Sequence, residues 1–174
     1  CGLFFNSKID FLDINLDTFD IDIDLLKKKL EIAKIKKKIP KAIVIVHLGG
    51  NPCDLEEINK LPKKYDFKII EDASHALGAK YKNSKIGDCK YSDMCIFSFH
   101  AIKMITTGEG GAITMKDSNI FQKVSDLNSH GINRKTKTNK SDWYYENYKL
   151  SSNFRLTDFQ CALGLNQLKR IKLF

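Results

Sequence analysis

A lysine between an apolar segment and a glycine-rich turn is the residue of this chain best suited to chemistry. Residues 98–111 read SFHAIKMITTGEGG, and Lys103 is the lysine of this stretch. Because the chain has 26 lysines, the argument rests on what surrounds this one. A lysine amine can hold an aldehyde cofactor as a Schiff base, as in enzymes that use pyridoxal phosphate. The glycines at 108, 110 and 111 would let the backbone turn tightly after such a lysine.

Further polar residues could complete a site of this kind. Asp72 follows an apolar segment, and a carboxylate there could keep a pyridine nitrogen protonated, while His75 and Ser98 could donate hydrogen bonds to a ring oxygen and a phosphate. Taken singly, an aspartate after a strand is more often a turn or cap residue, and a glycine turn is more often a hairpin. His47, Asp72, Ser98 and His100 all follow predicted strands. Because ligands of open α/β sheets bind beyond the carboxyl ends of strands, the sequence predicts a pocket there.

Metal, ATP and NAD chemistry are disfavoured. The four histidines, at 47, 75, 100 and 130, have no metal-ligand spacing. The five cysteines are odd in number and form no CxxC pair, so we expect no metal site and no disulfide framework, but reduced and mostly buried thiols. The glycines match neither a Walker loop nor GxGxxG.

The elements that would position these residues alternate between strand and helix patterns. Strands are predicted at 11–14, 42–46, 67–70, 94–99 and 110–115, and helices at 22–37, 54–65, 117–128 and from Thr157 onward. Residues 42–46, AIVIV, are apolar at every position, which predicts a parallel strand covered on both faces. Thr157 and Gln160 predict a capping box, followed by a broad apolar helix face. Residues 131–153 have no clear period and are expected to run over the surface. The fold class predicted is α/β.

Composition sets the remaining limits. A length of 174 residues with 43% hydrophobic content fits one globular domain, and no apolar run is long enough for a membrane span, so we expect a cytoplasmic protein without a membrane partner. The net charge of +8 could indicate nucleic-acid binding. The lysine runs at 27–29 and 36–38 fall on the polar side of a predicted helix, however, so we interpret them as solvated faces and expect no nucleic-acid partner.

Four motifs together resemble one protein family. They are EDASHALGA (71–79), SFHAIKMITTGEGG (98–111), SHGINR (129–134) and NFRLTDFQCALGLNQLKR (153–170), supported by the weaker VHLGGNPCDLEEI (46–58). In this order they resemble the DegT/DnrJ/EryC1/StrS nucleotide-sugar aminotransferases. The resemblance implies the central part of the large domain of a fold-type I PLP-dependent transferase, with a mostly parallel sheet flanked by helices and truncated at both ends. Residues 1–174 would be a partial PLP-binding large domain, without the N-terminal segment and the small C-terminal domain.

The resemblance also implies a role for each candidate residue. Lys103 would be the Schiff-base lysine and proton shuttle, Asp72 would pair with the pyridinium nitrogen, and His75 would lie beside the cofactor ring. Ser98 would bind the phosphate of pyridoxal 5'-phosphate. Asn153 would reach the phosphate of the cofactor in the other subunit of a homodimer.

The implied reaction moves an amino group from L-glutamate to a UDP-linked 4-keto-6-deoxy sugar. Within the family, the motifs look most like members of the pseudaminic acid route, in surface polysaccharide or flagellin glycan synthesis. Because family members are much longer, we expect weak or no activity from the isolated chain. A non-catalytic truncated subunit, or a relic that pairs with a full-length aminotransferase, is the alternative. A family dehydratase is disfavoured because histidine replaces the lysine there, and only the charge favours a nucleic-acid-binding domain.

Overall fold

The computed structural model describes residues 2–133 and 143–173, and it divides into two compact units, Cys1–Phe97 (unit 1) and Ser98–Phe174 (unit 2). Each unit is described by itself below. No helix among the described residues is long and apolar enough to cross a membrane.

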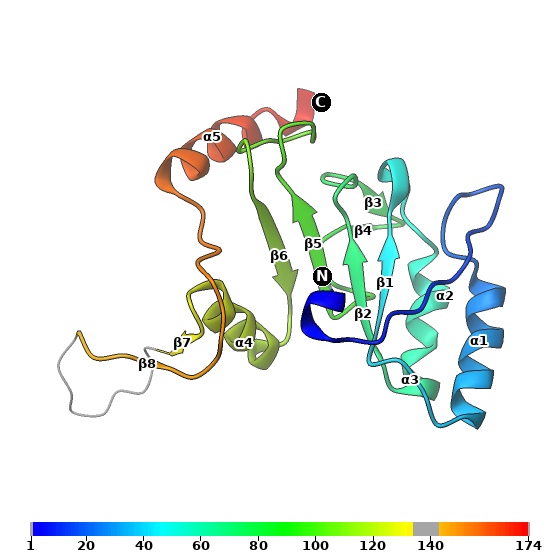
Figure 1. The fold of residues 1–174 in the computed structure, drawn as a ribbon. Helices are drawn as coiled ribbons and strands as arrows, with labels where there is room; N and C mark the ends of the chain where they lie inside the picture. The colour runs from blue at the N-terminus through cyan, green and yellow to red at the C-terminus, as the bar shows by residue number, and fades with distance from the viewer. Residues whose placement is uncertain (1, 134–142, 174) are drawn as a thin grey trace. The chain divides into compact units, whose positions relative to one another are not determined.

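Unit 1 is built on a parallel sheet. Strands β1 (Ala42–Val46), β2 (Lys68–Asp72) and β5 (Met94–Ser98) lie side by side with β2 in the middle (Figure 1). Asp72 pairs in register with Val46 on one side and Ile96 on the other. The strands predicted at 42–46, 67–70 and 94–99 are therefore confirmed, with small differences at their ends. Asp72 lies at the carboxyl end of the middle strand.

The two faces of this sheet differ in burial. Ile45, Ile69, Glu71 and Cys95 point to one face and are fully or almost fully buried, whereas Val44 and Val46 on the opposite face are 55% and 43% exposed. Coverage of both faces, expected from the apolar run 42–46, is thus not found within unit 1. Because side chains alternate along a strand, Glu71 points into the core and Asp72 points to the open face.

Three helices supply the core of unit 1. α1 (Ile23–Ile35), α2 (Leu55–Lys60) and α3 (Pro62–Tyr65) gather on one side of the sheet (Figure 1). Their buried residues are Leu26, Leu30, Leu55, Ile58 and Tyr65. The Asp22 side chain caps α1 by accepting a hydrogen bond from the Leu25 N–H. The single helix predicted at 54–65 is two helices, because Pro62 has no N–H to continue the hydrogen-bond ladder and begins a new turn instead.

The strand predicted at 11–14 is wrong. This segment forms only one bridge, between Ile14 and Ile21, and Phe11 is 84% exposed. The carboxylates of Asp10 and Asp13 accept hydrogen bonds from the next backbone N–H, a local bond that competes with sheet pairing. A small hairpin of β3 (Lys80–Tyr81) and β4 (Ser84–Lys85) was not predicted. Two short 3₁₀ turns complete unit 1, η1 (Gly2–Phe5) and η2 (Leu48–Gly50).

Unit 2 contains β6 (Gly111–Met115), α4 (Ser118–Asn128) and α5 (Asp158–Leu168), close to their predicted ranges. Within 131–153, where we expected a surface excursion, β7 (Ile132–Asn133) pairs with β8 (Glu146–Asn147), and residues 134–142 lie outside the described residues. The capping box of Thr157 and Gln160 is confirmed, and η3 (Ile171–Leu173) follows α5. The apolar residues of α5 are exposed, with Phe159 at 90% and Leu165 at 62%.

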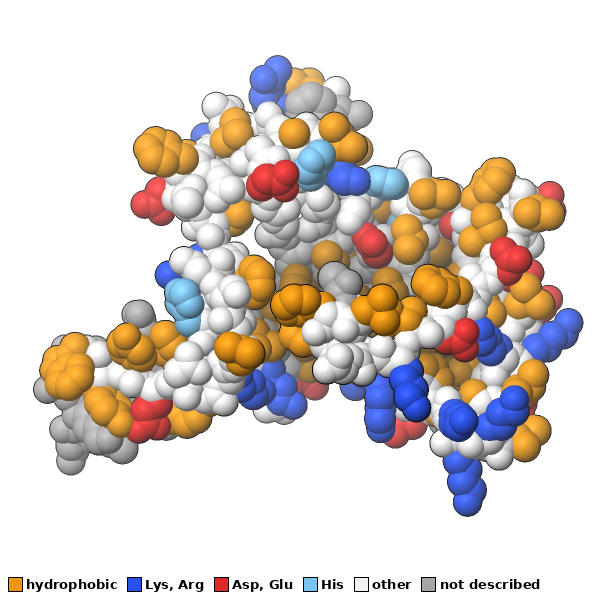
Figure 2. Space-filling model, in the orientation of Figure 1, with side chains coloured by type: hydrophobic (Ala, Val, Ile, Leu, Met, Phe, Trp, Pro, Cys, Tyr) orange, Lys and Arg blue, Asp and Glu red, His pale blue; other side chains and the backbone are white. Residues whose placement is uncertain are grey.

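The lysine-rich segments lie at the surface, as expected. Lys36, Lys37 and Lys38 are all exposed just after α1. Lys27 and Lys29 are partly exposed and pair with carboxylates, Lys29 with Asp10. Basic side chains gather in the part of Figure 2 where Figure 1 shows α1 and α3. Lys27 and Lys29 therefore lie on the exposed side of α1, whereas the run 36–38 follows the helix, which ends at Ile35 and not at the predicted residue 37.

Candidate active site

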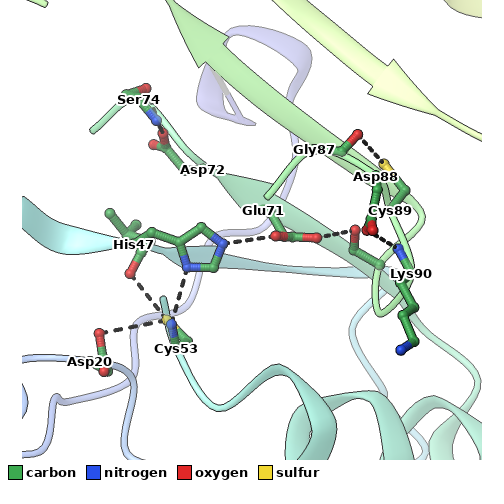
Figure 3. A network of polar contacts seen from close by, with 12 residues as sticks. Asp20, His47, Cys53, Glu71, Asp72, Ser74, Gly87, Asp88, Cys89 and Lys90 are labelled. Atoms are coloured by element: carbon green, nitrogen blue, oxygen red, sulfur yellow. Dashed lines mark hydrogen bonds and ion pairs between the residues drawn. The ribbon is translucent and has the colours of Figure 1, made fainter. Parts of the chain in front are cut away.

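Asp72 presents its carboxylate on the open face of the sheet. One oxygen, Oδ1, accepts hydrogen bonds from the Ser74 N–H at 3.1 Å and the Ser74 hydroxyl at 2.6 Å (Figure 3). Ser74 therefore fixes the orientation of the carboxylate, while Oδ2 has no hydrogen-bond partner within residues 2–133 and 143–173 and could accept a hydrogen bond from a ligand. This is the arrangement expected of a residue that pairs with a protonated ring nitrogen.

His75 lies three residues further on and is exposed. Its Nδ1 accepts a hydrogen bond from the Gly49 N–H at 3.3 Å. Since Nδ1 accepts, the proton of the neutral imidazole lies on Nε2, which is then a donor. The neighbouring Gly50 has a φ of +86°, and a Cβ there would lie 2.9 Å from the His75 carbonyl oxygen. The η2 turn thus packs against His75 and determines which ring nitrogen can donate.

A buried polar network lies beneath this strand end. His47 and Glu71 are 0% and 2% exposed, and His47 Nε2 lies 2.8 Å from Glu71 Oε2 (Figure 3). The other Glu71 oxygen accepts a hydrogen bond from the Ser92 hydroxyl. His47 Nδ1 accepts from the Cys53 N–H at 3.2 Å, so Nε2 carries the proton that Glu71 accepts. His47, which we placed in a pocket at the strand ends, is instead enclosed in the core because Glu71 is its partner.

The buried thiols are held in their neutral form. Burial, reinforced by the neighbouring Asp20 carboxylate, raises the pKa of Cys53 to about 12. Burial, reinforced by Glu71, also raises the pKa of the Cys95 thiol well above its ordinary value. Burial likewise raises the pKa of Asp20, and its hydrogen bond with Cys53 opposes that effect. Among the described cysteines, Cys53, Cys89 and Cys95 are buried and Cys161 is exposed, which agrees with the mostly buried thiols expected from the sequence.

Lys103 lies in a loop of unit 2 that is anchored at both ends. The Phe99 N–H donates to the Gly110 carbonyl, and the Phe99 carbonyl accepts from the Thr107 N–H, both at 2.9 Å. The Lys103 N–H closes a turn onto the His100 carbonyl, and Ile105 of the same loop is only 2% exposed. Lys103 itself is partly exposed, and its amine has no ion-pair partner among residues 2–133 and 143–173. The loop therefore holds a partly exposed lysine on a fixed backbone.

Two further residues of unit 2 present donors. Ser98 ends β5, and its oxygen accepts from the His100 N–H at 3.3 Å, which leaves the hydroxyl proton for a ligand. The side-chain oxygen Oδ1 of Asn153 accepts from the Arg155 N–H at 3.1 Å, which leaves the side-chain NH₂ group as a donor. Asn153 is exposed and bridges to Ser129.

The predicted residues therefore fall into three places. Asp72 and His75 lie at the carboxyl end of β2 in unit 1, Ser98 ends β5 with Lys103 in the loop that follows it, and Asn153 lies beside the end of α4. No group of three or more potential metal ligands occurs among the described residues. Sequence reasoning missed the Gly49 N–H as the partner of His75 and the pairing of His47 with Glu71. The spacing between HLGG and EDASH contained no signal for either contact.

The DegT/DnrJ/EryC1/StrS aminotransferase family matches residues 3–174. The chain belongs to this family. The UDP-4-amino-4,6-dideoxy-N-acetyl-beta-L-altrosamine transaminase of Campylobacter jejuni (serotype O:2) is 46% identical over 130 residues, which is 75% of this chain and 33% of that protein. The structure of Helicobacter pylori PseC, an aminotransferase in the biosynthesis of pseudoaminic acid, superimposes with a TM-score of 0.85 at 37% identity and covers 98% of this chain and 42% of that chain.

The structure of a third relative bears on the cofactor. Spr1654 of Streptococcus pneumoniae, solved in a PLP-form, superimposes with a TM-score of 0.75 at 30% identity over 96% of this chain and 44% of that one. The family and fold expected from the motifs are thus confirmed, and the chain spans about a third of the length of its curated relatives, 33% in the Campylobacter case. The membership makes this a chain of the aminotransferase class.

Proposed function

We propose that this chain forms part of a pyridoxal phosphate-dependent nucleotide-sugar aminotransferase in which Lys103 holds the cofactor. The observation that carries the proposal is the anchored loop after β5, which holds the partly exposed Lys103 on a fixed backbone five residues after Ser98 at the strand end. A reactive lysine needs this combination of access and fixed backbone.

The donors and acceptors present fit a phosphorylated pyridine aldehyde. Ser98 offers a hydroxyl and Asn153 an amide to a phosphate, the latter to the cofactor of the second subunit, and His75 offers Nε2–H to a ring oxygen. Asp72 would hold the proton on the ring nitrogen, and the Lys103 amine would carry a proton to and from the reacting carbon. When bound, the cofactor supplies the electron sink for amino-group transfer.

We further propose that L-glutamate is the amino donor and that a UDP-linked 4-keto-6-deoxy sugar is the acceptor, within pseudaminic acid synthesis. The name of the Campylobacter relative, a transaminase of a UDP-linked dideoxy sugar, supports this substrate class. The proposal includes a homodimer for the full-length protein, a partial PLP-binding large domain for residues 1–174 and a cytoplasmic location. It also includes weak or no activity for these residues alone.

Labelling at Lys103 tests the proposal. The purified chain is mixed with pyridoxal phosphate and reduced with borohydride, and the phosphopyridoxyl label is mapped by mass spectrometry. We expect label concentrated at Lys103 and lost in Lys103→Ala, with the exposed Lys36 and Lys37 as internal references for nonspecific reaction. Equal label at Lys103 and at these reference lysines would refute the proposed role.

The alternative is a non-catalytic subunit that pairs with a full-length aminotransferase. Its support is the exposed apolar surface of α5, where Phe159 is 90% and Leu165 62% exposed. Co-expression with a tagged full-length homologue tests it. Stable co-purification that is lost in Phe159→Ser, without label at Lys103, would favour this alternative over the cofactor proposal.

A further inference from the structure

One face of α5 lies against the loop that carries Lys103, and this face is polar. Gln160, Gly164 and Gln167 follow one another at spacings of four and three residues, so they share one side of the helix. They are partly buried, whereas the apolar residues of α5 are exposed. Two hydrogen bonds between this helix and the loop come from its glutamines.

Each glutamine bonds the backbone of the loop. The Gln160 Nε2 donates to the Glu109 carbonyl oxygen at 2.8 Å. The Gln167 Oε1 accepts from the Thr106 N–H at 2.8 Å. One amide thus acts as a donor and the other as an acceptor, and they hold two points of the loop on the C-terminal side of Lys103.

The glycine between them permits close approach. A Cβ at Gly164 would lie 2.9 Å from Thr107 Cγ2, a side chain that is only 5% exposed. The Thr107 hydroxyl also donates to the Glu109 carbonyl at 2.7 Å, so that carbonyl accepts from Thr107 and Gln160 together. The helix and the loop are therefore in direct contact at Gly164 and Thr107.

We propose that Gln160 and Gln167 are positioning residues that fix the loop 99–110, so that α5 determines where the Lys103 amine is held. The inference rests on the proposed function, in which Lys103 holds the cofactor. Neither glutamine touches a reacting atom, because both act through the backbone at Thr106 and Glu109.

Replacing glutamine by glutamate is expected to keep the contact with the loop at position 167 and to break it at position 160. Gln167→Glu keeps an oxygen that accepts from Thr106, so the contact survives. Gln160→Glu keeps the oxygen that accepts from the Thr157 N–H at 2.9 Å and so preserves the capping box, and its added charge favours the first turn of α5. It loses the donor, however, and places a carboxylate against the Glu109 carbonyl. The helix is retained while the loop contact breaks.

Hydrogen exchange and lysine labelling on the 174-residue chain test this inference. In Gln160→Glu and Gln167→Ala we expect the peptide 99–110 to exchange about fivefold faster, because each change removes one net hydrogen bond. In Gln167→Glu we expect exchange within about twofold of the wild type. Asn166→Glu, an exposed neighbour that adds the same charge without touching the loop, is the control and is expected to have no effect.

Labelling separates this inference from the proposed function. Reductive methylation with formaldehyde reports the accessibility of Lys103 without the cofactor, and reduction with pyridoxal phosphate reports cofactor capture. We expect Gln160→Glu to lower cofactor label at Lys103 about fivefold and to change its methylation rate, whereas Gln167→Glu changes neither. If the wild type takes no cofactor label, the proposed function fails, and exchange and methylation still decide the role of α5. Unchanged exchange and methylation in Gln160→Glu and Gln167→Ala would overturn the inference.

Discussion

His47 and Glu71 form a buried pair, and replacing both residues should lower the free energy of unfolding by far less than the sum of the two single replacements. In His47→Leu the Glu71 carboxylate, 2% exposed, loses the donor 2.8 Å away and keeps only the Ser92 hydroxyl. Taking a hydrogen-bond donor away from a buried carboxylate costs about 3 kcal/mol. In Glu71→Leu the buried His47 Nε2–H has no acceptor, at a cost of about 1 to 3 kcal/mol. In the double variant neither group is left unpaired.

The remaining losses cancel in a double-mutant cycle. The Cys53 N–H loses its acceptor whenever His47 is changed, and the Ser92 hydroxyl loses its acceptor whenever Glu71 is changed, so each loss occurs in one single variant and again in the double variant. The interaction energy between His47 and Glu71 is therefore isolated, and we expect it to be about 2 kcal/mol. Glu71→Gln is the milder companion, because its amide oxygen can face His47 while the Ser92 hydroxyl turns to accept from the NH₂ group.

Urea unfolding followed by circular dichroism measures the cycle. The free energies of unfolding of the wild type, the two single leucine variants and the double variant are compared at one pH, with equal m-values as the check on two-state behaviour. We expect Glu71→Gln to lose about 1 to 2 kcal/mol. Additive losses in the double variant, within about 0.5 kcal/mol, would refute the pairing of His47 with Glu71 as an energetic unit.

Further predictions concern the turn, the thiols and a helix cap. Gly49→Ala should cost about 1 to 2 kcal/mol of stability, because φ is +62° but nothing lies near the added Cβ. Gly50→Ala should cost clearly more, because its Cβ would lie 2.9 Å from a backbone oxygen, and thermal unfolding of the two variants compares them. The pKa of Cys53 is raised from 9.0 to about 12, so the neutral thiol stabilises the fold below about pH 9. The free energy of unfolding should then fall as the pH rises toward 12, by at most about 1.4 kcal/mol per pH unit. Cys53→Ser should flatten that dependence in urea titrations, and equal slopes would contradict it. With iodoacetamide at neutral pH, the exposed Cys161 should react and Cys53 should not, as peptide mapping will show. Asp117→Ala, which removes two hydrogen bonds at the start of α4, should cost about 1 kcal/mol by urea unfolding.

Much of the fold could be predicted because local signals and burial agree. The run 42–46 favoured a strand because its residues are apolar and mostly β-branched, and Asp22, Asp117 and Thr157 begin helices where their side chains can accept backbone hydrogen bonds. The segment 11–14 failed because its alternation had no partner strand, and strand pairing is a long-range property that a local pattern does not contain.

The site could be predicted in its residue types but not in its contacts. Lys103, Asp72 and Ser98 are found on the expected loop and strand ends, because the alternation of strands and helices determines those positions. The pairing of His47 with Glu71 joins residues 24 apart in sequence, and the bond from Gln167 to Thr106 spans 61 residues. Such contacts depend on how elements pack, so neither periodicity nor motif spacing could indicate them.

Glu71 and Asp72 are adjacent on the middle strand, and their side chains point to opposite faces of the sheet. Glu71 faces the enclosed network and Asp72 the open face, and a single peptide unit separates the two environments. Substitutions at either position alter one environment at a time. Loss or gain of one residue earlier in β2 would move every later side chain of the strand to the other face of the sheet. The carboxylate of Asp72 would then point toward the core, and Glu71 would be exposed. Among natural or engineered variants of this chain, we therefore expect length changes within 68–72 to be rejected even where substitutions are accepted.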